Sequence, residues 1–153
     1  MTPEQVDQFF KAQKAIPGSP TWRSISRPSE RRARLPVEVD GILSSVELEV
    51  IVDLVRANYL VIVLLAPTCI TRLCLLGGHW NRMTREHIDG PHWHPWQANR
   101  PTGRSIKSSL THAEPLPTTV KSRDEAFAWF LNQVGIDSPR WAPVQWPQNE
   151  GFL

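Results

Sequence analysis

The stretch VELEVIVDL, residues 46–54, alternates apolar with mostly acidic side chains, and the stretch YLVIVLL, residues 59–65, is continuously apolar. Alternation with a period of two predicts a strand with one buried face and one solvent face, whereas a short apolar run is typical of a central strand. Ala57-Asn58 lies between the two stretches, at a position suited to a turn. We therefore expect two neighbouring antiparallel strands in the middle of a sheet.

Two further strands are expected beside this pair. Residues 35–39 alternate in the same way and end at Asp40-Gly41, a strong turn signal. Residues 69–76 form another apolar segment, which a double glycine ends. The short connections predict an antiparallel meander over residues 32–78.

Helices are predicted at both ends of the chain. Each begins with Thr or Ser followed three residues later by Gln or Glu, which is the capping-box pattern, and the predicted ranges are 1–18 and 122–135. The remaining segments are a polar linker over 19–31, a long His/Trp-rich loop over 79–117 and an extended tail over 139–153. The expected fold is thus one α+β domain over residues 1–153 with a four- to five-stranded antiparallel sheet.

Composition excludes several classes of protein. The chain has 153 residues and a formal net charge of only +2, which does not by itself indicate a nucleic-acid-binding protein. The longest apolar run, about twelve residues, is shorter than the roughly twenty that cross a bilayer, and no leader pattern is visible, so we expect a cytoplasmic protein without membrane contact. The chain has no phosphate-cradling glycine loop, dinucleotide fingerprint or nucleophile elbow. Cys69 and Cys74 are expected to be buried thiols.

Four of the five histidines lie close together in the expected loop, at His79, His87, His92 and His94. His92 and His94 flank Trp93, so in an extended segment their side chains point to the same side, about 7 Å apart. His79 follows the double glycine and can approach the same point if the loop folds back. This segment is therefore where we expect any chemistry to be found.

Three interpretations of the cluster stay open. In the first, His79, His92 and His94 bind a metal such as zinc and leave a fourth coordination position open. In the second, two histidines act as acid and base on a phosphodiester, and a nearby cation stabilises the developing charge. The candidates for that cation are Arg72, Arg82, Arg85 and Lys107. In the third, the histidines are structural, bonding the loop backbone and stacking on Trp80, Trp93 and Trp96.

A spaced pattern runs through this region, from Arg72-Leu73 through Gly77, His79, Asn81, Ile88 and Gly90 to His92 and His94. It resembles a motif of a family of small uncharacterised prokaryotic and phage proteins, approximately R-L-x-x-x-G-x-H-x-N followed by I-x-G-x-H-x-H. The resemblance covers about residues 30–136 and is most specific around the histidines. It implies that His79, Asn81, His92 and His94 act as one unit, and it makes His87 a bystander, but it names no reaction.

Three other groups of residues each have a functional and a structural interpretation. The arginines after Trp22 can contact phosphates, although a solvated linker is the favoured interpretation; they are Arg23, Arg27, Arg31, Arg32 and Arg34. Four tryptophans can stack on bases, but we expect them to pin loops and tail to the core; they are Trp93, Trp96, Trp141 and Trp146. Glu47, Glu49 and Asp53 can form an acidic site, and a solvent-facing stripe is the favoured interpretation.

The function predicted from these features is a small nuclease-like protein of a mobile-element, toxin or defence context, acting on RNA or DNA. His79, His92 and His94 are its expected acid/base groups or metal ligands, with Arg72 and Asn81 in the same site. The alternative is a non-enzymatic binding or inhibitor protein whose Trp-rich loop contacts a protein partner. The two hypotheses differ in whether the three imidazoles converge on one point.

Overall fold

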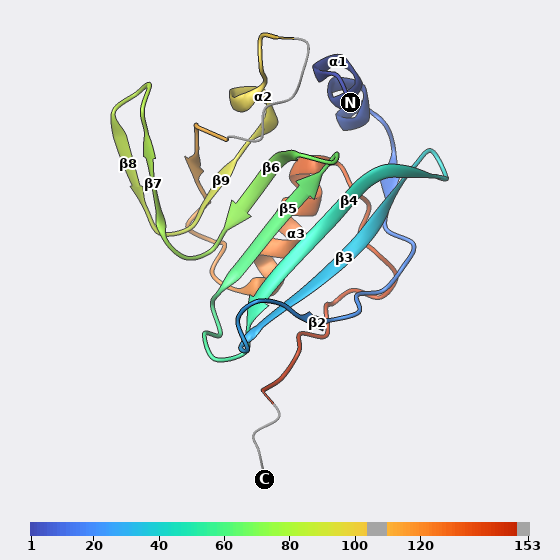
Figure 1. Ribbon diagram of the computed structural model, residues 1–153, viewed down its shortest axis with the longest axis vertical. Helices are drawn as coiled ribbons and strands as arrows, with labels where there is room; N and C mark the ends of the chain where they lie inside the picture. Colours follow the sequence, from blue (N-terminus) through green and yellow to red (C-terminus); the bar gives the residue numbers. More distant parts are fainter. Residues whose placement is uncertain (104–109, 150–153) are drawn as a thin grey trace.

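The computed structural model describes residues 1–103 and 110–149. Within them, eight strands form one antiparallel sheet in the order β1-β3-β4-β5-β6-β9-β10, with β2 paired to β3, and β7 and β8 form a separate hairpin (Figure 1). The elements are α1 Pro3–Lys11, β1 Lys14–Ala15, β2 Arg23–Ser24, β3 Glu30–Val39, β4 Ile42–Asp53, β5 Leu60–Leu65, β6 Cys69–Cys74, β7 Gly78–Asn81, β8 Glu86–Asp89, β9 His92–His94, α2 Trp96–Asn99, β10 Glu114–Pro115 and α3 Arg123–Val134. The α+β class and the helices near both ends are as the sequence predicts.

The centre of the sheet is the expected meander, because β3, β4, β5 and β6 are neighbours in the sheet as they are in the chain. Val46, Leu48, Val50 and Val52 of β4 are at most 2% exposed and form the buried face of that strand. The alternating pattern of β4 therefore identified both the strand and its inward side.

The sheet is larger than predicted, and residues 79–117 are not a loop. This region holds β7, β8, β9, α2 and β10 among its described residues. β9 pairs with the edge of β6, and β10 pairs with β9. Strands of two to four residues are too short to display a period, so the sequence pattern does not reveal them. Arg104 and Lys107, both basic residues of the expected loop, lie outside the described residues.

Both helices begin at the predicted capping boxes, of Thr2 with Gln5 and of Ser122 with Glu125. The first helix ends earlier than expected, at Lys11, because the ammonium of Lys14 satisfies carbonyls at its C-terminal end. That nitrogen donates to the oxygens of Phe9, Phe10 and Ala12 at 2.7–3.1 Å. None of the described helices has the length and apolar character needed to span a membrane.

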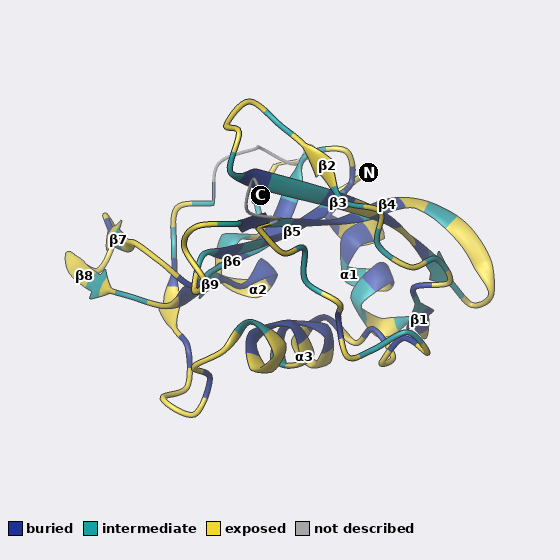
Figure 2. Cartoon of the chain, turned by 90° about the horizontal axis from the view of Figure 1, so that it is seen from below, coloured by how far each residue is buried: buried dark blue, intermediate teal, exposed yellow. Residues whose placement is uncertain are grey.

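The two faces of the sheet differ. The inner face packs against α3, which lies behind the sheet in Figure 1 and below it in Figure 2. Val6 and Phe9 of α1 and Trp96 of α2 belong to the same hydrophobic core. The outer face, turned toward the reader in Figure 1, thus carries none of the three helices.

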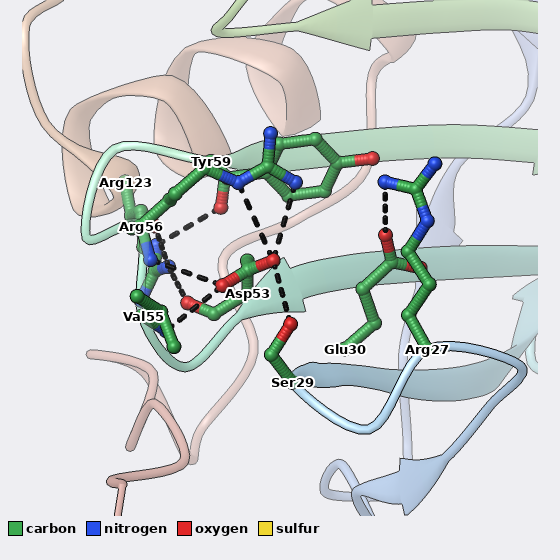
Figure 3. Close-up of polar contacts among 8 residues, drawn as sticks. All are labelled: Arg27, Ser29, Glu30, Asp53, Val55, Arg56, Tyr59 and Arg123. Carbon is green, nitrogen blue, oxygen red and sulfur yellow. Dashed lines mark hydrogen bonds and ion pairs between the residues drawn. The ribbon is translucent and has the colours of Figure 1, made fainter.

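The acidic stripe predicted on β4 faces solvent at Glu47 but not at Glu49 or Asp53. Glu49 is 7% exposed and Asp53 only 3%. Asp53 accepts hydrogen bonds from the Ser29 hydroxyl, the backbone N–H groups of Val55 and Arg56, and the Arg56 guanidinium (Figure 3). These donors hold the pKa of the Asp53 carboxyl well below its usual range. The carboxylate therefore fastens the turn after β4 and is not a candidate catalytic group.

The linker and the tail are joined to each other and to α3. The Trp22 indole N–H donates to the carbonyl of Gln145 at 3.2 Å, and its ring lies 5.9 Å from that of Trp146. Trp141 and Trp146 also pack on Phe127 of α3. These contacts support the prediction that tryptophans pin the tail; residues 150–153 lie outside the described part.

Candidate metal centre

Strand β9 places two histidines on the outer face of the sheet. His92 pairs with Cys74 of β6, and His94 pairs with Arg72, so all four side chains project to the same side. Trp93, between them, points inward and packs edge-on against Trp129 of α3, with ring centroids 5.0 Å apart. The alternation seen in the sequence thus fixes the direction of both histidines.

The β7–β8 hairpin returns His79 to the same place. Its base is closed by a hydrogen bond of 2.9 Å from the N–H of Gly90 to the oxygen of Gly77, and both glycines have positive φ. Gly78 follows directly, and a Cβ there would lie 2.9 Å from the backbone oxygen of Ile88. The hairpin therefore needs this glycine for close pairing of its strands.

Asn81 anchors the hairpin and does not face the histidine cluster as a reacting group. It is 1% exposed, and its amide makes two hydrogen bonds of 2.8 Å with the backbone N–H and oxygen of Ala113. A buried side-chain amide paired in this way holds two segments in a fixed relation. Asn81 thus bonds the same segment, residues 111–113, whose carbonyls also accept from His79 and His94.

The three imidazoles converge. Ring centroids lie 4.7 Å apart for His79 and His94, 5.3 Å for His92 and His94, and 6.0 Å for His79 and His92. One nitrogen from each ring falls in a set whose members all lie within 4.8 Å of one another. His92 and His94 are buried, at 3% and 0% exposure, while His79 is half-buried. The predicted triad is therefore one compact cluster of two buried imidazoles and one half-buried imidazole.

Each imidazole is held by one backbone carbonyl. Nε2 of His79 bonds the oxygen of Thr111 at 2.9 Å, Nδ1 of His92 that of Gly90 at 2.9 Å, and Nδ1 of His94 that of His112 at 3.1 Å. Because a carbonyl only accepts, each of these nitrogens must carry the proton. The opposite nitrogen of a neutral ring is then bare, as a metal ligand must be.

Burial keeps the two inner rings neutral. Desolvation, with a smaller contribution from the Arg72 guanidinium, lowers the pKa of His94 to about 3, and desolvation also lowers the pKa of His92. Nη2 of Arg72 lies 3.1 Å from Nε2 of His94 and donates to it. The Nε of Arg72 is buried and has no hydrogen-bond partner within the described ranges. Arg72 thus sits against the nitrogen that a metal would use.

The other predicted candidates lie away from this point. Arg82 and Arg85 are exposed in the hairpin turn, and His87 is exposed and bonds Asp89 at 2.9 Å, as expected of a bystander. Trp96 packs on Phe10 and donates to Asp7. The histidine rings contact one another and not the tryptophans, so the stacking part of the structural interpretation is wrong.

Sequence reasoning missed the segment that fixes the cluster. The oxygens of Thr111, His112 and Ala113, three consecutive residues, accept from His79, His94 and Asn81 respectively. Backbone carbonyls belong to every residue type, so no pattern of side chains reveals them. The Thr71 hydroxyl donates to the backbone oxygen of His94 at 2.7 Å and so also holds β9 in place.

Comparisons of the chain with protein-family models, with curated proteins and with solved structures give no match. The resemblance of the histidine segment to the prokaryotic and phage family stays a prediction. The functional argument therefore depends on the geometry of the cluster alone.

Proposed function

We propose that His79, His92 and His94 form a three-histidine centre for a divalent metal, with zinc foremost, and that the protein is a metal-dependent phosphodiester hydrolase of the nuclease type. The observation that carries this proposal is the convergence of three imidazoles, in which one nitrogen of each ring lies within 4.8 Å of the others and each ring is also bonded to a backbone carbonyl. Three neutral imidazoles are a donor set that zinc uses in hydrolytic sites.

The same observations favour a metal over paired acid/base histidines. An acid/base pair needs one imidazole that is protonated near neutral pH, and the pKa of His94 near 3 keeps that ring uncharged. Nitrogens that bind one tetrahedral zinc at about 2.0–2.1 Å lie about 3.4 Å apart. The nitrogens of the three rings lie within 4.8 Å of one another, so they must approach one another by up to about 1.4 Å to bind zinc. His79, the half-buried member on a separate hairpin, can supply that movement.

Three protein ligands leave a fourth position for water. A bound metal supplies its chemistry by lowering the pKa of that water toward neutrality, which generates a nucleophile for a phosphorus atom. The buried rings of His92 and His94 keep the inner side of the centre dry, so substrate must approach from the side of His79.

Arg72 is the cation placed to stabilise the charge that develops on the phosphoryl oxygens. Its guanidinium donates to Nε2 of His94 in the structure. When a metal takes that nitrogen, the guanidinium loses its acceptor and is repelled by the metal. It is then free to donate to an anionic oxygen of the substrate, in the way arginine binds phosphate groups.

A second candidate function, protein binding, has one observation in its favour. Trp80 and Met83 on the protruding hairpin are 51% and 91% exposed. Large exposed apolar side chains on a projecting element are typical of contact surfaces. In this alternative the histidines serve only to hold the hairpin.

The test combines metal analysis with a cleavage assay. Wild-type protein equilibrated with zinc should retain about one ion per chain and cleave end-labelled RNA or DNA, and His79→Ala and His92→Ala should bind zinc at least tenfold more weakly and lose cleavage. His87→Ala is the matched control, because His87 is exposed on the same hairpin and lies outside the cluster. Equal zinc binding by His79→Ala and wild type, or cleavage that survives both substitutions, would overturn the proposal.

A further inference from the structure

The outer face of the sheet connects the histidine cluster to a group of arginines by one row of paired residues. Across the strands from β3 to β9, Arg34 pairs with Glu49, Glu49 with Val63, Val63 with Arg72 and Arg72 with His94. Residues paired in antiparallel strands project from the same face. The five side chains therefore form a line that runs straight from the arginine edge to the candidate metal centre.

At the far end of this row the arginines enclose a hollow. Arg23, Arg32 and Arg34 line a depression of about 510 Å³ together with Thr21, Ser24 and Ile25. Arg23 and Arg34 are exposed, and Arg32 is half-buried. Their grouping here corrects the favoured interpretation of these three as a solvated linker, because Arg32 and Arg34 lie within β3 and Arg23 within β2.

The arginines exceed the carboxylates beside them. Glu49 lies 2.7 Å from Nε of Arg34 and 3.4 Å from Nε of Arg32, and Glu47 lies 4.0 Å from Arg34. Glu30 and Asp53 lie at one end of the same face, and each is paired with its own arginine, Arg27 and Arg56. Elsewhere on this face, four guanidinium groups, those of Arg23, Arg32, Arg34 and Arg72, lie near the two carboxylates of Glu47 and Glu49. The surface is therefore positive although the whole chain carries only +2.

Between Glu49 and Arg72 the face is apolar. Ile51, Val61 and Leu65 are half-buried, and Val63 at the centre is 8% exposed. β3 and β9 are separated by four strand spacings, which corresponds to about 19 Å. That distance is the length of several nucleotides of a polyanion.

We propose that a single-stranded nucleic acid lies across this outer face, with backbone phosphates on Arg23, Arg32 and Arg34 and a later phosphodiester at the three-histidine centre. The second contact depends on the function proposed above, whereas the first does not. The outer face carries none of the described helices (Figure 2), its arginines complement the charge of phosphates, and it is joined in register to the candidate hydrolytic centre.

A single strand fits better than a duplex because two of the three histidines are fully recessed. His92 and His94 are at most 3% exposed, so a phosphate must enter below the protein surface to reach a metal beside them. A flexible strand can do so at little cost, while a duplex holds its phosphates on a stiff cylinder and must be deformed. The outer-face residues of β3 to β6 include no aromatic side chain, so binding should depend on phosphates and not on base stacking.

The experiment measures binding without cleavage. Fluorescence anisotropy of labelled oligo-dT and oligo-U, each of about twelve nucleotides, is recorded with His92→Ala protein in a chelating buffer over a range of salt. Arg23→Gln and the double substitution Arg23→Gln/Arg34→Gln are compared in that background with Arg140→Gln, an exposed arginine in the segment after α3. Arg23→Gln leaves both ion pairs of Glu49 intact, so its effect does not depend on refolding of β3.

We expect the double substitution to weaken binding at least tenfold and to reduce the salt slope by about 0.7 per arginine removed. Arg140→Gln should change neither. The proposal is overturned by equal losses in Arg140→Gln, by the absence of binding, by a duplex that binds as tightly as the single strand, or by equally effective competition from poly-glutamate. If the arginines are needed for binding but wild-type protein never cleaves, the binding surface is supported and the hydrolase function is refuted. If the protein cleaves but binding does not depend on the arginines, the hydrolase function is supported and the binding surface is refuted.

Discussion

At the scale of single residues, the cluster is defined by which nitrogen of each ring is occupied. Three carbonyls take one nitrogen from each imidazole, and Arg72 donates to the remaining nitrogen of His94. The guanidinium therefore stands where a metal would stand. Because Arg72 donates to the nitrogen of His94 that a metal would bind, we expect Arg72 and a metal to compete for that nitrogen.

Replacing Arg72 should strengthen metal binding while weakening cleavage. In Arg72→Met the competing charge-assisted hydrogen bond, typically about 1.5–3 kcal/mol, is gone, so zinc affinity should rise about tenfold or more. The buried Nε without a partner also disappears, so the free energy of unfolding should change little. Isothermal titration with zinc checks this expectation; weaker binding in Arg72→Met would mean that the arginine supports the site.

Buried His94 should make the metal-free protein sensitive to mild acid. Its pKa is about 3 in the folded state and about 6.5 when the chain is unfolded, so the unfolded state takes up the proton first as pH falls. The free energy of unfolding should therefore drop by about 1.2 kcal/mol from this residue between roughly pH 6 and 5, where carboxylates stay largely ionised in both states. Urea unfolding at several pH values should show a shallower slope in His94→Gln, and an unchanged slope would contradict the assignment.

At the scale of elements, the β7–β8 hairpin has to be anchored to the body of the protein because it carries His79, one of the three proposed ligands. It belongs to a different sheet from β9, and its connections to the body include Asn81 with Ala113 and His79 with Thr111. An isolated two-stranded hairpin is marginally stable, so these anchors decide where His79 lies.

Loosening the hairpin should damage the metal centre and leave the core intact. In Gly78→Ala the new Cβ would meet the backbone oxygen of Ile88 at 2.9 Å, so the paired strands must separate. We expect zinc affinity to fall at least tenfold while the melting temperature of the metal-free protein changes by only a few degrees. Gly18→Ala is the control, since a Cβ there has no neighbour within 4 Å. Equal zinc affinity in the two variants would show that the hairpin does not position His79.

The elements that are long enough to show a regular pattern or that begin at a capping box could be predicted from the sequence, and the shortest strands could not. The alternation of β4 and the capping boxes of α1 and α3 are local signals, and each identified its element. β7, β8, β9 and β10 have at most four residues each, and β9 and β10 pair with strands distant in the chain. The histidines were recognised by their chemistry and spacing, but the carbonyls of residues 111–113 that fix them leave no trace in the residue types.

At the scale of the whole molecule, the residues that stabilise the fold and the candidate functional residues lie on opposite faces of the sheet. The inner face and α3 hold the hydrophobic core, and the outer face carries the arginine hollow, the apolar centre and the histidines. Substitutions on the outer face can therefore change binding without exposing the core.

Zinc should stabilise the folded chain as a whole. A ligand that binds only the folded state adds about 2.7 kcal/mol at one hundred times its dissociation constant, which corresponds to a rise of several degrees in the melting temperature. Thermal unfolding with and without zinc should show this rise in wild type and His87→Ala. The same rise in His79→Ala would place the zinc elsewhere.

The most direct measurement is X-ray absorption at the zinc edge of the zinc-loaded protein. We expect three imidazole ligands at about 2.0–2.1 Å with a fourth light-atom ligand, and the loss of one imidazole in His79→Ala. A spectrum without three imidazoles, or one that is identical in His79→Ala, would contradict a metal centre built from His79, His92 and His94.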